Sequence, residues 1–432
     1  MIMGAPPVSV FIGDDFTGAS DTLATWARSG VRAKLFLDPA EALRVDEELD
    51  VVGIATELRG LTAAQIRSRA ATLAAAVAEL KPRFVHYKVC STFDSSPDTG
   101  SIGAAVQELE AVLEPRLTLV LGGQPSLARY CVFGTLFARA ADGLVHRIDR
   151  HPVMRQHPIT PMTEADLAVH LAAQGLDGLK PVPFTEFSAG PDALLALLEA
   201  DSRDAPARLL LDAVSAQDIS VIGQALGRLS GNEPILLVGA SSVAEALRDP
   251  AVRLSSPAPI AKPDARPRTG PCLVVAGSRS AVTDAQVHAA TLFDTFPLLP
   301  GILDEPERLK AVVECVSSSL AEGRNVLAHT MPGTDYRMDA TTLTARLVEF
   351  VSTTLARARC ARLGVAGGDT SSAICQKLGF TALEFSSDLD PGVSLCIGHH
   401  GDPGLDRMEL MLKGGQMGRL DLLDRFATGW RT

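Results

Sequence analysis

Short, uniformly apolar runs alternate with longer Ala-rich segments along almost the whole chain. In the first half these runs predict strands at 8–13, 33–37, 51–55, 84–89, 117–121, 209–211 and 235–238. The segments between them repeat apolar residues at helical spacing and predict helices at 62–80, 101–113, 164–173 and 218–229. Strands this apolar are typical of a parallel sheet that helices cover on both faces. The alternation therefore predicts an α/β fold.

A proline-rich stretch divides the chain between residues 249 and 271, where repeated prolines disfavour both helices and central strands. After it the alternation restarts with CLVVAGS, NVLAHTM, RLGVAG, ALEFSS, SLCIG and MELMLKGG, and helices are predicted at 281–292, 306–321 and 340–358. We predict two α/β domains with mainly parallel sheets, at 1–250 and 271–432, joined by a linker at 251–270. An interdomain cleft is a usual place for a ligand.

Composition limits the partners of this 432-residue chain. Its net charge of -11, without any cluster of Lys and Arg, argues against a nucleic-acid partner. The seven cysteines are scattered without a CxxC pair, which favours reduced thiols. The N-terminus lacks signal-peptide features and no apolar run approaches the roughly 20 residues that span a membrane. We expect a cytoplasmic protein without a membrane partner, and a homodimer stays open.

The first candidate site is IGDDFTGASDT, in which a strand ends at Asp14 and Asp15 before a helix begins. Ligands of open α/β sheets bind at the carboxyl ends of strands. Adjacent side chains point in different directions, so one carboxylate can face a ligand while the other caps the helix. Simple helix capping explains the pair about equally well.

The second candidate site is HYKVCSTFDSSPDTGSIG, from His86 to Gly103, where a strand ends at Lys88 and a hydroxyl-rich loop follows. An ammonium group can pair with a carboxylate, and the side chains of Ser91 and Thr92 can exchange hydrogen bonds with hydroxyls. These are the groups that a small hydroxylated acid needs. The alternative is a Ser-rich surface loop.

The third candidate site consists of three glycine-containing loops, AGSRS at 276–280, AGGDTSS at 366–372 and LKGGQMG at 412–418. Glycines let backbone N–H groups approach a ligand closely, and helix N-termini attract anions. Together the loops predict a polyphosphate site to which Lys413 adds a charge. Neither GxxxxGK[ST] nor GxGxxG occurs at these positions, so each loop alone also fits a tight βα connection.

The fourth candidate is GHHGDPG, where His399, His400 and Asp402 lie close together and permit the alternative of a metal-dependent hydrolase. Consecutive histidines on a strand point to opposite faces, and the spacing is not that of a helical zinc pair. We therefore predict no protein-held metal at this sequence.

Taken together, these segments resemble the four-carbon acid sugar kinase family over nearly the whole chain. IGDDFTGASDT resembles the family's A-D-D-x-T-G-A-x-D-T signature, ATELRG at 55–60 its arginine-bearing segment, and KVCSTFDSSPDTGSIG its K-x-x-S-T-x-x-G-x-I-G segment with a longer loop. AGSRS, AGGDTSSAICQ and LKGGQMG resemble its nucleotide loops, the last of which usually reads L-K-S-G-N-F-G. The resemblance implies an ATP-dependent kinase for a small sugar acid in carbohydrate metabolism.

The resemblance also implies which residues bind each ligand. The sugar acid would be surrounded in the N-terminal domain by Asp14, Asp15, Arg59, Lys88, Ser91 and Thr92. ATP would be met in the C-terminal domain by Ser278, Ser280, Gly367, Gly368, Asp369, Thr370, Lys413, Gly414 and Gly415. The inserted loop at 93–99, with Gly414, Gln416 and Met417, departs from the family pattern and puts the usual linear substrate in doubt, since these residues also suit a larger or branched acid such as the 3-oxo-isoapionate type. Four-carbon aldonates, 3-oxo-tetronates and branched acids all stay open as substrates.

Phosphoryl transfer depends mainly on alignment and charge neutralisation, much of it supplied by Mg²⁺. We expect Arg59 and Lys88 to hold the substrate carboxylate, and Asp14 or Asp15 to orient the hydroxyl and accept its proton. The sequence does not choose between the two aspartates. A sensor that binds a sugar acid without turnover is a further alternative.

Overall fold

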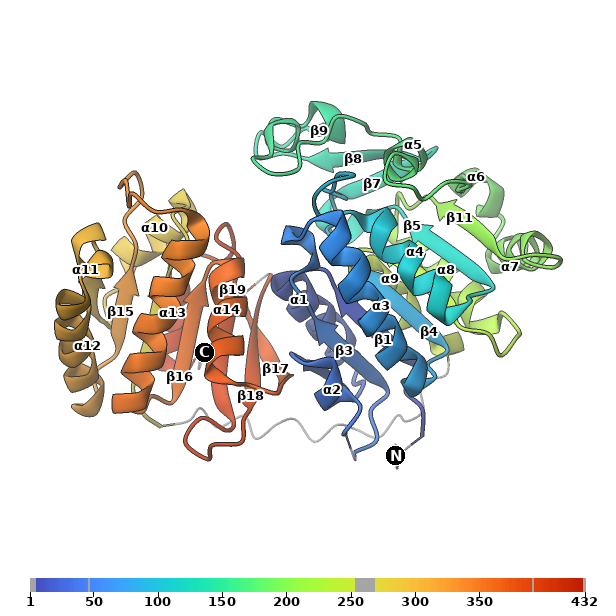
Figure 1. Cartoon of the computed structure of the whole chain (residues 1–432). Coiled ribbons are helices and arrows are strands. Elements are labelled where there is room, and N and C mark those ends of the chain that lie inside the picture. Colours follow the sequence, from blue (N-terminus) through green and yellow to red (C-terminus); the bar gives the residue numbers. More distant parts are fainter. Residues whose placement is uncertain (1–4, 46, 253–268, 391, 430–432) are drawn as a thin grey trace. The chain divides into compact units, whose positions relative to one another are not determined.

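The structure is a computed structural model that describes residues 5–45, 47–252, 269–390 and 392–429. The chain divides into two compact units, Met1–Pro259 and Ile260–Thr432, called unit 1 and unit 2 here (Figure 1). Residues 251 and 252 of the predicted linker belong to a short 3-10 helix, Pro250–Val252, and residues 253–268 lie outside the described part.

Unit 1 is built on a parallel sheet of eight strands in the order β10-β11-β5-β12-β4-β1-β3-β2. The strands are β1 (Ser9–Gly13), β2 (Ala33–Phe36), β3 (Val51–Ala55), β4 (Phe84–Lys88), β5 (Leu117–Leu121), β10 (Lys180–Val182), β11 (Ala207–Leu211) and β12 (Ile235–Gly239). Every residue of β1, β3, β4, β5 and β12 is buried, as their apolar sequences require.

Helices cover both faces of this sheet. On one face α3 packs against α4, and on the other α8 packs against α7 and α9, which also contacts α1. Their bounds are α1 (Phe16–Ala27), α3 (Ala63–Leu80), α4 (Ile102–Leu113), α7 (Pro191–Asp201), α8 (Ala216–Arg228) and α9 (Ser242–Leu247). Right-handed crossovers that run in opposite directions along a sheet place their helices on opposite faces. In Figure 1, α3 and α4 lie in front of the strands.

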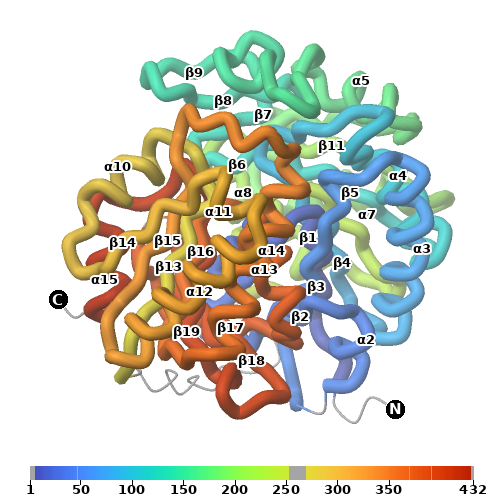
Figure 2. Tube along the Cα trace, turned by 60° about the vertical axis from the view of Figure 1, so that its left-hand side comes forward, coloured from blue at the N-terminus to red at the C-terminus, as the bar shows by residue number. Residues whose placement is uncertain are grey.

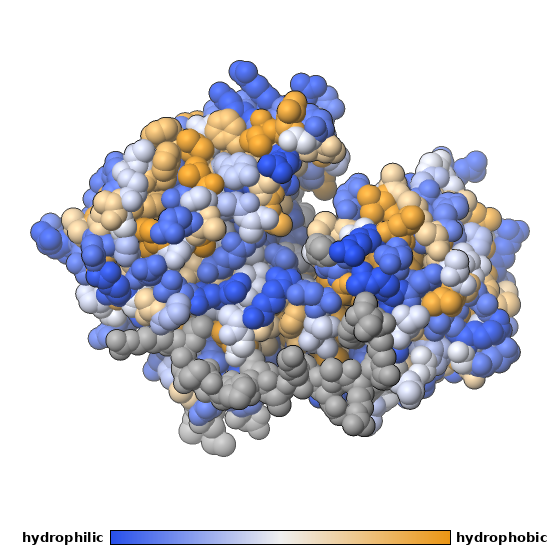
Figure 3. Space-filling model, turned by 180° about the vertical axis from the view of Figure 1, so that it is seen from behind, coloured by the Kyte–Doolittle hydropathy of each residue, from blue (hydrophilic) through white to orange (hydrophobic). Residues whose placement is uncertain are grey.

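A small antiparallel sheet, which the sequence reading missed, follows β5. Its strands are β6 (Gly123–Gln124), β7 (Arg129–Val132), β8 (Thr135–Arg139) and β9 (Val145–Arg147), and Figure 1 shows most of it at the top of unit 1. Several large apolar side chains in this part of the chain are exposed, including Leu144 and Val153 at 62% each. In Figure 3 hydrophobic areas are interspersed with hydrophilic ones on the upper part of unit 1.

Unit 2 is built on a seven-stranded sheet in the order β17-β18-β19-β16-β13-β15-β14. Its strands are β13 (Cys272–Ala276), β14 (Asp294–Pro297), β15 (Val326–His329), β16 (Arg362–Ala366), β17 (Ala382–Asp390), β18 (Val393–His399) and β19 (Met408–Lys413). All pairings are parallel except those of β18, which runs antiparallel to β17 and β19.

Helices also cover the sheet of unit 2. Helix α13 packs against α12 and α14, whereas α10 contacts α15. The bounds are α10 (Ala281–Ala289), α12 (Pro306–Ala321), α13 (Ala340–Arg357), α14 (Gly368–Leu378) and α15 (Leu422–Thr428). Apolar side chains such as Val274, Leu327, Met411 and Phe426 form one buried cluster that joins strands to α15. The fold is thus α/β in both units, with mainly parallel strands, as predicted.

No helix in the described ranges combines the length and the apolar character of a membrane span.

Candidate functional site

In unit 1, connections leave neighbouring strands in opposite directions at β1 and β4. Strand β1 leads through α1 to β2 on one side, whereas β4 leads through α4 to β5 on the other. Ligands of open α/β sheets bind at such a topological switch point, at the carboxyl ends of the strands. Gly13 and Lys88, the last residues of these strands, are paired in register, and Figure 2 shows β1 and β4 near β3. This edge brings the two predicted sugar-acid segments together.

Asp14 and Arg59 form a bidentate ion pair at this edge. Arg59 Nε donates to Asp14 Oδ2 at 3.0 Å and Nη2 donates to Oδ1 at 2.7 Å. Burial raises the pKa of Asp14, whose side chain is 7% exposed, and Arg59 opposes part of this rise. Burial in turn lowers the pKa of Arg59, but Asp14 and Asp15 outweigh it and the net shift is well upward. Mutual contact thus favours the charged forms of both side chains, although burial leaves the net shift in the pKa of Asp14 upward.

Asp15 both caps a helix and pairs with Arg59. Its Oδ1 accepts the backbone N–H of Gly18 at 2.8 Å, which fixes the start of α1, and its Oδ2 lies 2.9 Å from Arg59 Nη1. The side chain of Asp15 is 29% exposed, so it is far more accessible than Asp14. The capping role of Asp15 is therefore confirmed, and its carboxylate also remains partly exposed.

Lys88 lies close to the same carboxylate. It is 4% exposed, and its Nζ donates to the carbonyl of Val89 at 2.8 Å. A Cβ at Gly18 would be 2.6 Å from Lys88 Nζ and 2.5 Å from Asp15 Oδ1, so only glycine allows both groups to approach the helix start.

The loop after β4 is packed into unit 1. Thr92 and Asp94 are buried, and Thr92 Oγ1 donates to Asp94 Oδ1 at 2.5 Å. Phe93 between them is fully buried at a φ of 53°, in the left-handed region. The alternative of a solvated surface loop is therefore wrong for these residues. Ser91 is partly exposed, whereas the hydroxyl of Thr92, also predicted to bind the substrate, is bonded to Asp94 inside the loop.

Gly100 joins the same loop to the segment that carries Arg59. Its N–H donates to the Leu61 carbonyl at 2.9 Å, and its φ is +64°. A Cβ there would lie 2.7 Å from the Arg59 carbonyl oxygen. The close approach of these two segments depends on a residue without a side chain.

Unit 2 has its own switch point at β13 and β16. Strand β13 leads through α10 to β14 on one side, and β16 leads through α14 to β17 on the other. Ala276, Ala366 and Lys413 end β13, β16 and β19 in register, so the three glycine-containing loops leave the same edge of the sheet. Gly277 and Ser278 donate their N–H groups to the Ala366 carbonyl at 3.0 and 2.9 Å.

Small residues let these loops pack against one another. Gly367 has a φ of +131°, in the region that favours glycine, directly before Gly368 begins α14. A Cβ at Gly415 would lie 2.1 Å from Ser278 Oγ. Ser280 caps α10 through its hydroxyl, which also donates to the Gly415 carbonyl.

Three other residues predicted to bind ATP, Gly414, Thr370 and Asp369, differ in burial and contacts. Gly414 follows β19 and its carbonyl accepts from Lys413. Thr370 is buried in α14, with its Oγ1 next to Gly277. Asp369 belongs to α14, and its side chain lies outside the described part.

Lys413 is fully buried behind these loops. Its Nζ donates to Thr283 Oγ1 at 3.0 Å and to the Gly414 carbonyl at 3.2 Å. Burial lowers the pKa of Lys413 to about 8. These contacts place a positive charge behind glycine and hydroxyl residues at this edge.

Comparison with known proteins identifies both units. Residues 9–247 match a family model described as a sugar-binding N-terminal domain, and residues 273–423 match one described as a nucleotide-binding C-terminal domain. The chain belongs to the four-carbon acid sugar kinase family.

Relatives in this family include named kinases. The chain is 34% identical to a 3-oxo-isoapionate kinase of Paraburkholderia graminis, over 94% of this chain and 91% of the relative. It is 30% identical to a 3-oxo-tetronate kinase of Cupriavidus necator, over 97% of this chain and 96% of the relative.

Solved structures share the fold of this family member. A protein of Salmonella typhimurium LT2 superposes with a TM-score of 0.80 at 22% identity, covering 100% of both chains. A protein of Haemophilus influenzae superposes with a TM-score of 0.76 at 22% identity, over 97% of this chain and 99% of the other.

The histidine cluster of this family member has a structural role. His400 Nε2 is 2.7 Å from the Leu378 carbonyl, and its Nδ1 accepts the N–H of Asp402 at 2.7 Å. His399 instead pairs with Glu384 at 3.2 Å. Within the described ranges no group of three or more His, Cys, Asp or Glu side chains is arranged to hold a metal ion. The hydrolase alternative therefore has no metal centre in this part of the chain.

Three residues that organise the unit 2 edge were missed from the sequence. Thr283 Oγ1 donates to the Gly415 carbonyl at 2.8 Å, and Gln286 Nε2 donates to the carbonyls of Met417, Gly418 and Arg419. Thr330 Oγ1 contacts the carbonyls of Ala276 and Gly277, each at 3.2 Å. The buried polar face of α10 was the available signal for Thr283 and Gln286, which lie one turn apart.

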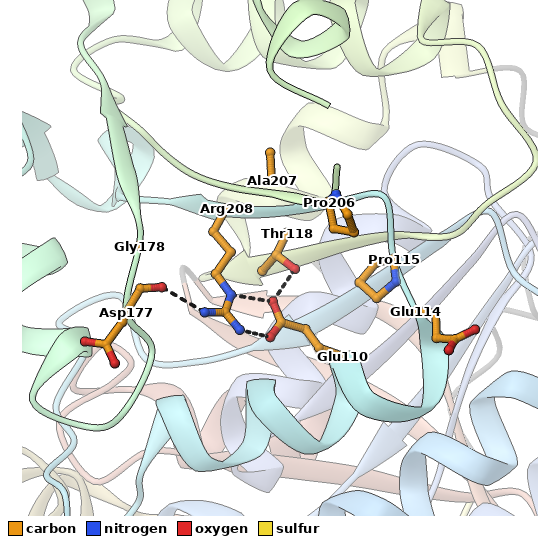
Figure 4. A pocket seen from close by; sticks show the side chains of 9 residues that line it. All are labelled: Glu110, Glu114, Pro115, Thr118, Asp177, Gly178, Pro206, Ala207 and Arg208. Carbon is orange, nitrogen blue, oxygen red and sulfur yellow. Dashed lines mark hydrogen bonds and ion pairs between the residues drawn. The ribbon is translucent and has the colours of Figure 1, made fainter. Parts of the chain in front are cut away.

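A pocket of about 670 Å³ in unit 1 lies away from the predicted residues (Figure 4). It is next to the first residues of β5 and β11, at the opposite edge of the sheet from Asp14. Arg208 binds Glu110 through two nitrogens, at 3.0 and 2.6 Å, and Thr118 Oγ1 donates to the same carboxylate at 2.7 Å. Arg208, Glu110 and Thr118 thus satisfy one another in this pocket.

Proposed function

We propose that the chain is an ATP-dependent kinase that phosphorylates a hydroxyl of a small sugar acid. The observation that carries the proposal is the difference in chemistry between the two switch points, together with the family membership. The edge of unit 1 presents Asp15, Arg59 and Lys88, whereas that of unit 2 presents glycines and hydroxyls at helix starts. The first suits a hydroxylated carboxylate and the second suits a polyphosphate.

The substrate that we propose is a branched acid of the 3-oxo-isoapionate type, with linear 3-oxo-tetronates as the alternative. The 34% identity to a 3-oxo-isoapionate kinase supports this choice. The longer loop after β4 also supports it, because this loop departs from the family pattern and its part at 92–95 is buried within unit 1.

We assign different roles to the two aspartates. Asp14 is buried and both of its oxygens accept from Arg59, so it holds the guanidinium in place. Asp15 is more accessible, and it would orient the substrate hydroxyl and accept its proton as the phosphoryl group is transferred. Lys88, with its ammonium beside Asp15, would lower the energy of the negative charge that the substrate brings.

In unit 2 the ATP phosphates would rest on the loops at 277–280, 367–370 and 414–415. The N-termini of α10 and α14 supply unpaired N–H groups and the positive end of the helix dipole. Lys413 would add its charge from behind the glycines.

Mg²⁺ would enter with ATP. Magnesium in kinases is held through substrate phosphates and one or two carboxylates, with no need for a protein cage. When bound, the ion would neutralise charge on the phosphates during transfer.

An ADP-release assay over four-carbon and branched five-carbon sugar acids tests the proposal. We expect turnover that needs ATP, Mg²⁺ and an acid, and product that carries one additional phosphoryl group by mass spectrometry. Activity that needs no ATP and is lost to a zinc chelator would instead indicate a hydrolase. Binding of both ligands without ADP release would indicate a sensor, and both results would overturn the kinase proposal.

A further inference from the structure

Arg129 is the first residue of β7 and lies in the small sheet that follows β5. It pairs with Gln124 of β6, which begins two residues after the carboxyl end of β5. Arg129 therefore lies beyond the same edge of the parallel sheet as Asp14 and Lys88. None of the four sequence segments that suggested a site contains this residue.

The guanidinium of Arg129 has an unusual set of partners. Its Nη1 donates to the carbonyl oxygens of Leu127, Ala128 and Arg139 at 2.9, 3.4 and 3.4 Å. Its Nε is buried and has no hydrogen-bond partner among the residues that the structure describes. Carbonyl oxygens fix one end of the group without neutralising its charge. A half-buried guanidinium whose Nε faces no acceptor is costly unless a ligand supplies one.

Electrostatic effects link Arg129 to the unit 1 edge. Burial lowers the pKa of Arg129, and the Cys90 side chain opposes this shift. Cys90 also acts on the pKa of Arg59 in the upward direction. Arg59 and Arg129 therefore both lie close enough to the side chain of Cys90, two residues after Lys88, to interact with it electrostatically.

The hairpin that carries Arg129 is held firmly over this edge. Cys131 N–H donates to the Ala213 carbonyl at 3.0 Å. At the turn, the N–H groups of Phe133 and Gly134 donate to the two oxygens of buried Asp212, at 2.7 and 3.0 Å. Because Asp212 follows β11 directly, the hairpin is fixed to the main sheet. A group on such a support is preorganised to bind a ligand.

Arg59 and Arg129 differ in what they can still bind. The Nε and both Nη atoms of Arg59 already contact Asp14 and Asp15. A planar guanidinium recognises a carboxylate best through two parallel N–H bonds, such as those from Nε and one Nη atom. On Arg129 the Nε still needs an acceptor.

We propose that Arg129 is the residue of unit 1 that binds the carboxylate of the sugar acid and so selects acids over neutral sugars. This inference rests on the proposed kinase activity and deepens it. In this assignment Arg59 forms ion pairs with Asp14 and Asp15, and Lys88 contributes a positive charge near the bound carboxylate.

The test compares Arg129→Ala and Arg129→Lys with wild type on 3-oxo-isoapionate and on its primary amide, which lacks the charge. For the acid we expect Arg129→Ala to raise KM roughly 30- to 100-fold with kcat within about threefold, as for loss of a charged hydrogen-bonded pair. For the amide, kcat/KM should change less than about twofold. Arg129→Lys should recover part of the loss, because it restores charge without the planar fork.

Arg139→Ala is the matched control, since Arg139 is an exposed arginine of the neighbouring strand β8. It should leave both substrates unaffected. Calorimetric titration of the acid without ATP gives a second readout that does not depend on turnover. Equal losses for acid and amide, or an unchanged KM for the acid, would overturn the role of Arg129. If wild type binds the acid in an Arg129-dependent way but releases no ADP, the kinase proposal fails and the binding role stands.

Discussion

The two sheets carry different chemical groups at their switch points, where the carboxyl ends of the strands of unit 1 and unit 2 lie. In unit 1 the edge carries charged side chains, and Asp14, Asp15 and Arg59 constrain one another through direct ion pairs. In unit 2 the loops carry glycines and hydroxyls, and Lys413 lies buried behind them. Charged side chains can distinguish one small acid from another, whereas backbone N–H groups recognise any phosphate. The difference suggests that specificity for the acid lies in unit 1.

The largest expected effect is on turnover when one charge of unit 1 is removed. Asp15→Asn keeps a helix-capping side chain but loses the base, so kcat should fall about 10²- to 10⁴-fold while KM for ATP stays nearly constant. Steady-state kinetics checks this. Asp38→Asn is the control, because Asp38 caps α2 (Pro39–Ala42) in the same unit. Near-normal turnover of Asp15→Asn would contradict its role as the base, and near-normal turnover of Asp14→Asn as well would remove both aspartates from the mechanism.

Arg59→Ala should affect both stability and catalysis. Breaking a buried ion pair leaves Asp14 without its counter-charge, and such changes cost about 3–5 kcal/mol of unfolding free energy. Urea unfolding measures this cost, and we expect kcat to fall as well. Arg32→Ala provides the comparison, because Arg32 pairs with buried Asp50 elsewhere in unit 1 and should reduce stability alone. An Arg59→Ala enzyme with normal stability and kcat would contradict the assigned role.

In unit 2 we expect ATP binding to weaken when a side chain is added to a glycine of the loops. Gly367→Ala forces a residue with a Cβ into a φ of +131° next to Ser278 and Thr370, at a cost of about 1–3 kcal/mol. We expect KM for ATP to rise about tenfold, with little change in KM for the acid. Gly323→Ala imposes positive φ at a position with nothing within 4 Å, and serves as the control for strain alone. A change in KM for the acid instead of KM for ATP would contradict the assignment of ATP binding to unit 2.

Lys413 gives an effect that depends on pH and leaves the assigned ligand contacts of unit 1 unchanged. Its pKa in the folded protein is about 8, below its ordinary value of 10.5, so between these values the unfolded chain binds more protons. Raising the pH through this window should therefore increase the free energy of unfolding of wild type relative to Lys413→Met. Denaturant unfolding at several pH values measures the difference, and Lys377→Met changes an exposed lysine of α14 as a control. A difference that does not vary with pH would show that Lys413 titrates normally.

Much of the fold could be predicted because its main strands are apolar throughout. The predicted strands at 51–55 and 117–121 coincide with β3 and β5, and the helix at 306–321 coincides with α12. The small sheet was missed because its strands are short and partly exposed, so neither apolar runs nor clear alternation mark them. The antiparallel direction of β18 was also missed, since an apolar strand has the same composition in either direction.

The candidate site could be predicted only where its residues directly follow a recognisable strand. Acids, glycines and hydroxyls that directly follow an apolar run are recognisable at the end of a strand. The ion pair of Asp14 with Arg59 joins residues 45 positions apart, and no local pattern indicates it. The site proposed at Arg129 depends on how a hairpin folds back over the sheet, which involves Ala213 and Asp212 far along the chain.

The sequence by itself determined the two rounds of strand and helix, the glycine loops and the caps such as Asp15, because each depends on residues within a few positions of one another. Tertiary structure alone decided the order of the strands, and with it which strand ends became neighbours. That order follows from burying both faces of each sheet under right-handed connections, a condition on the whole unit. It is what brings Lys88 next to Asp15, and Ser278 next to Gly415.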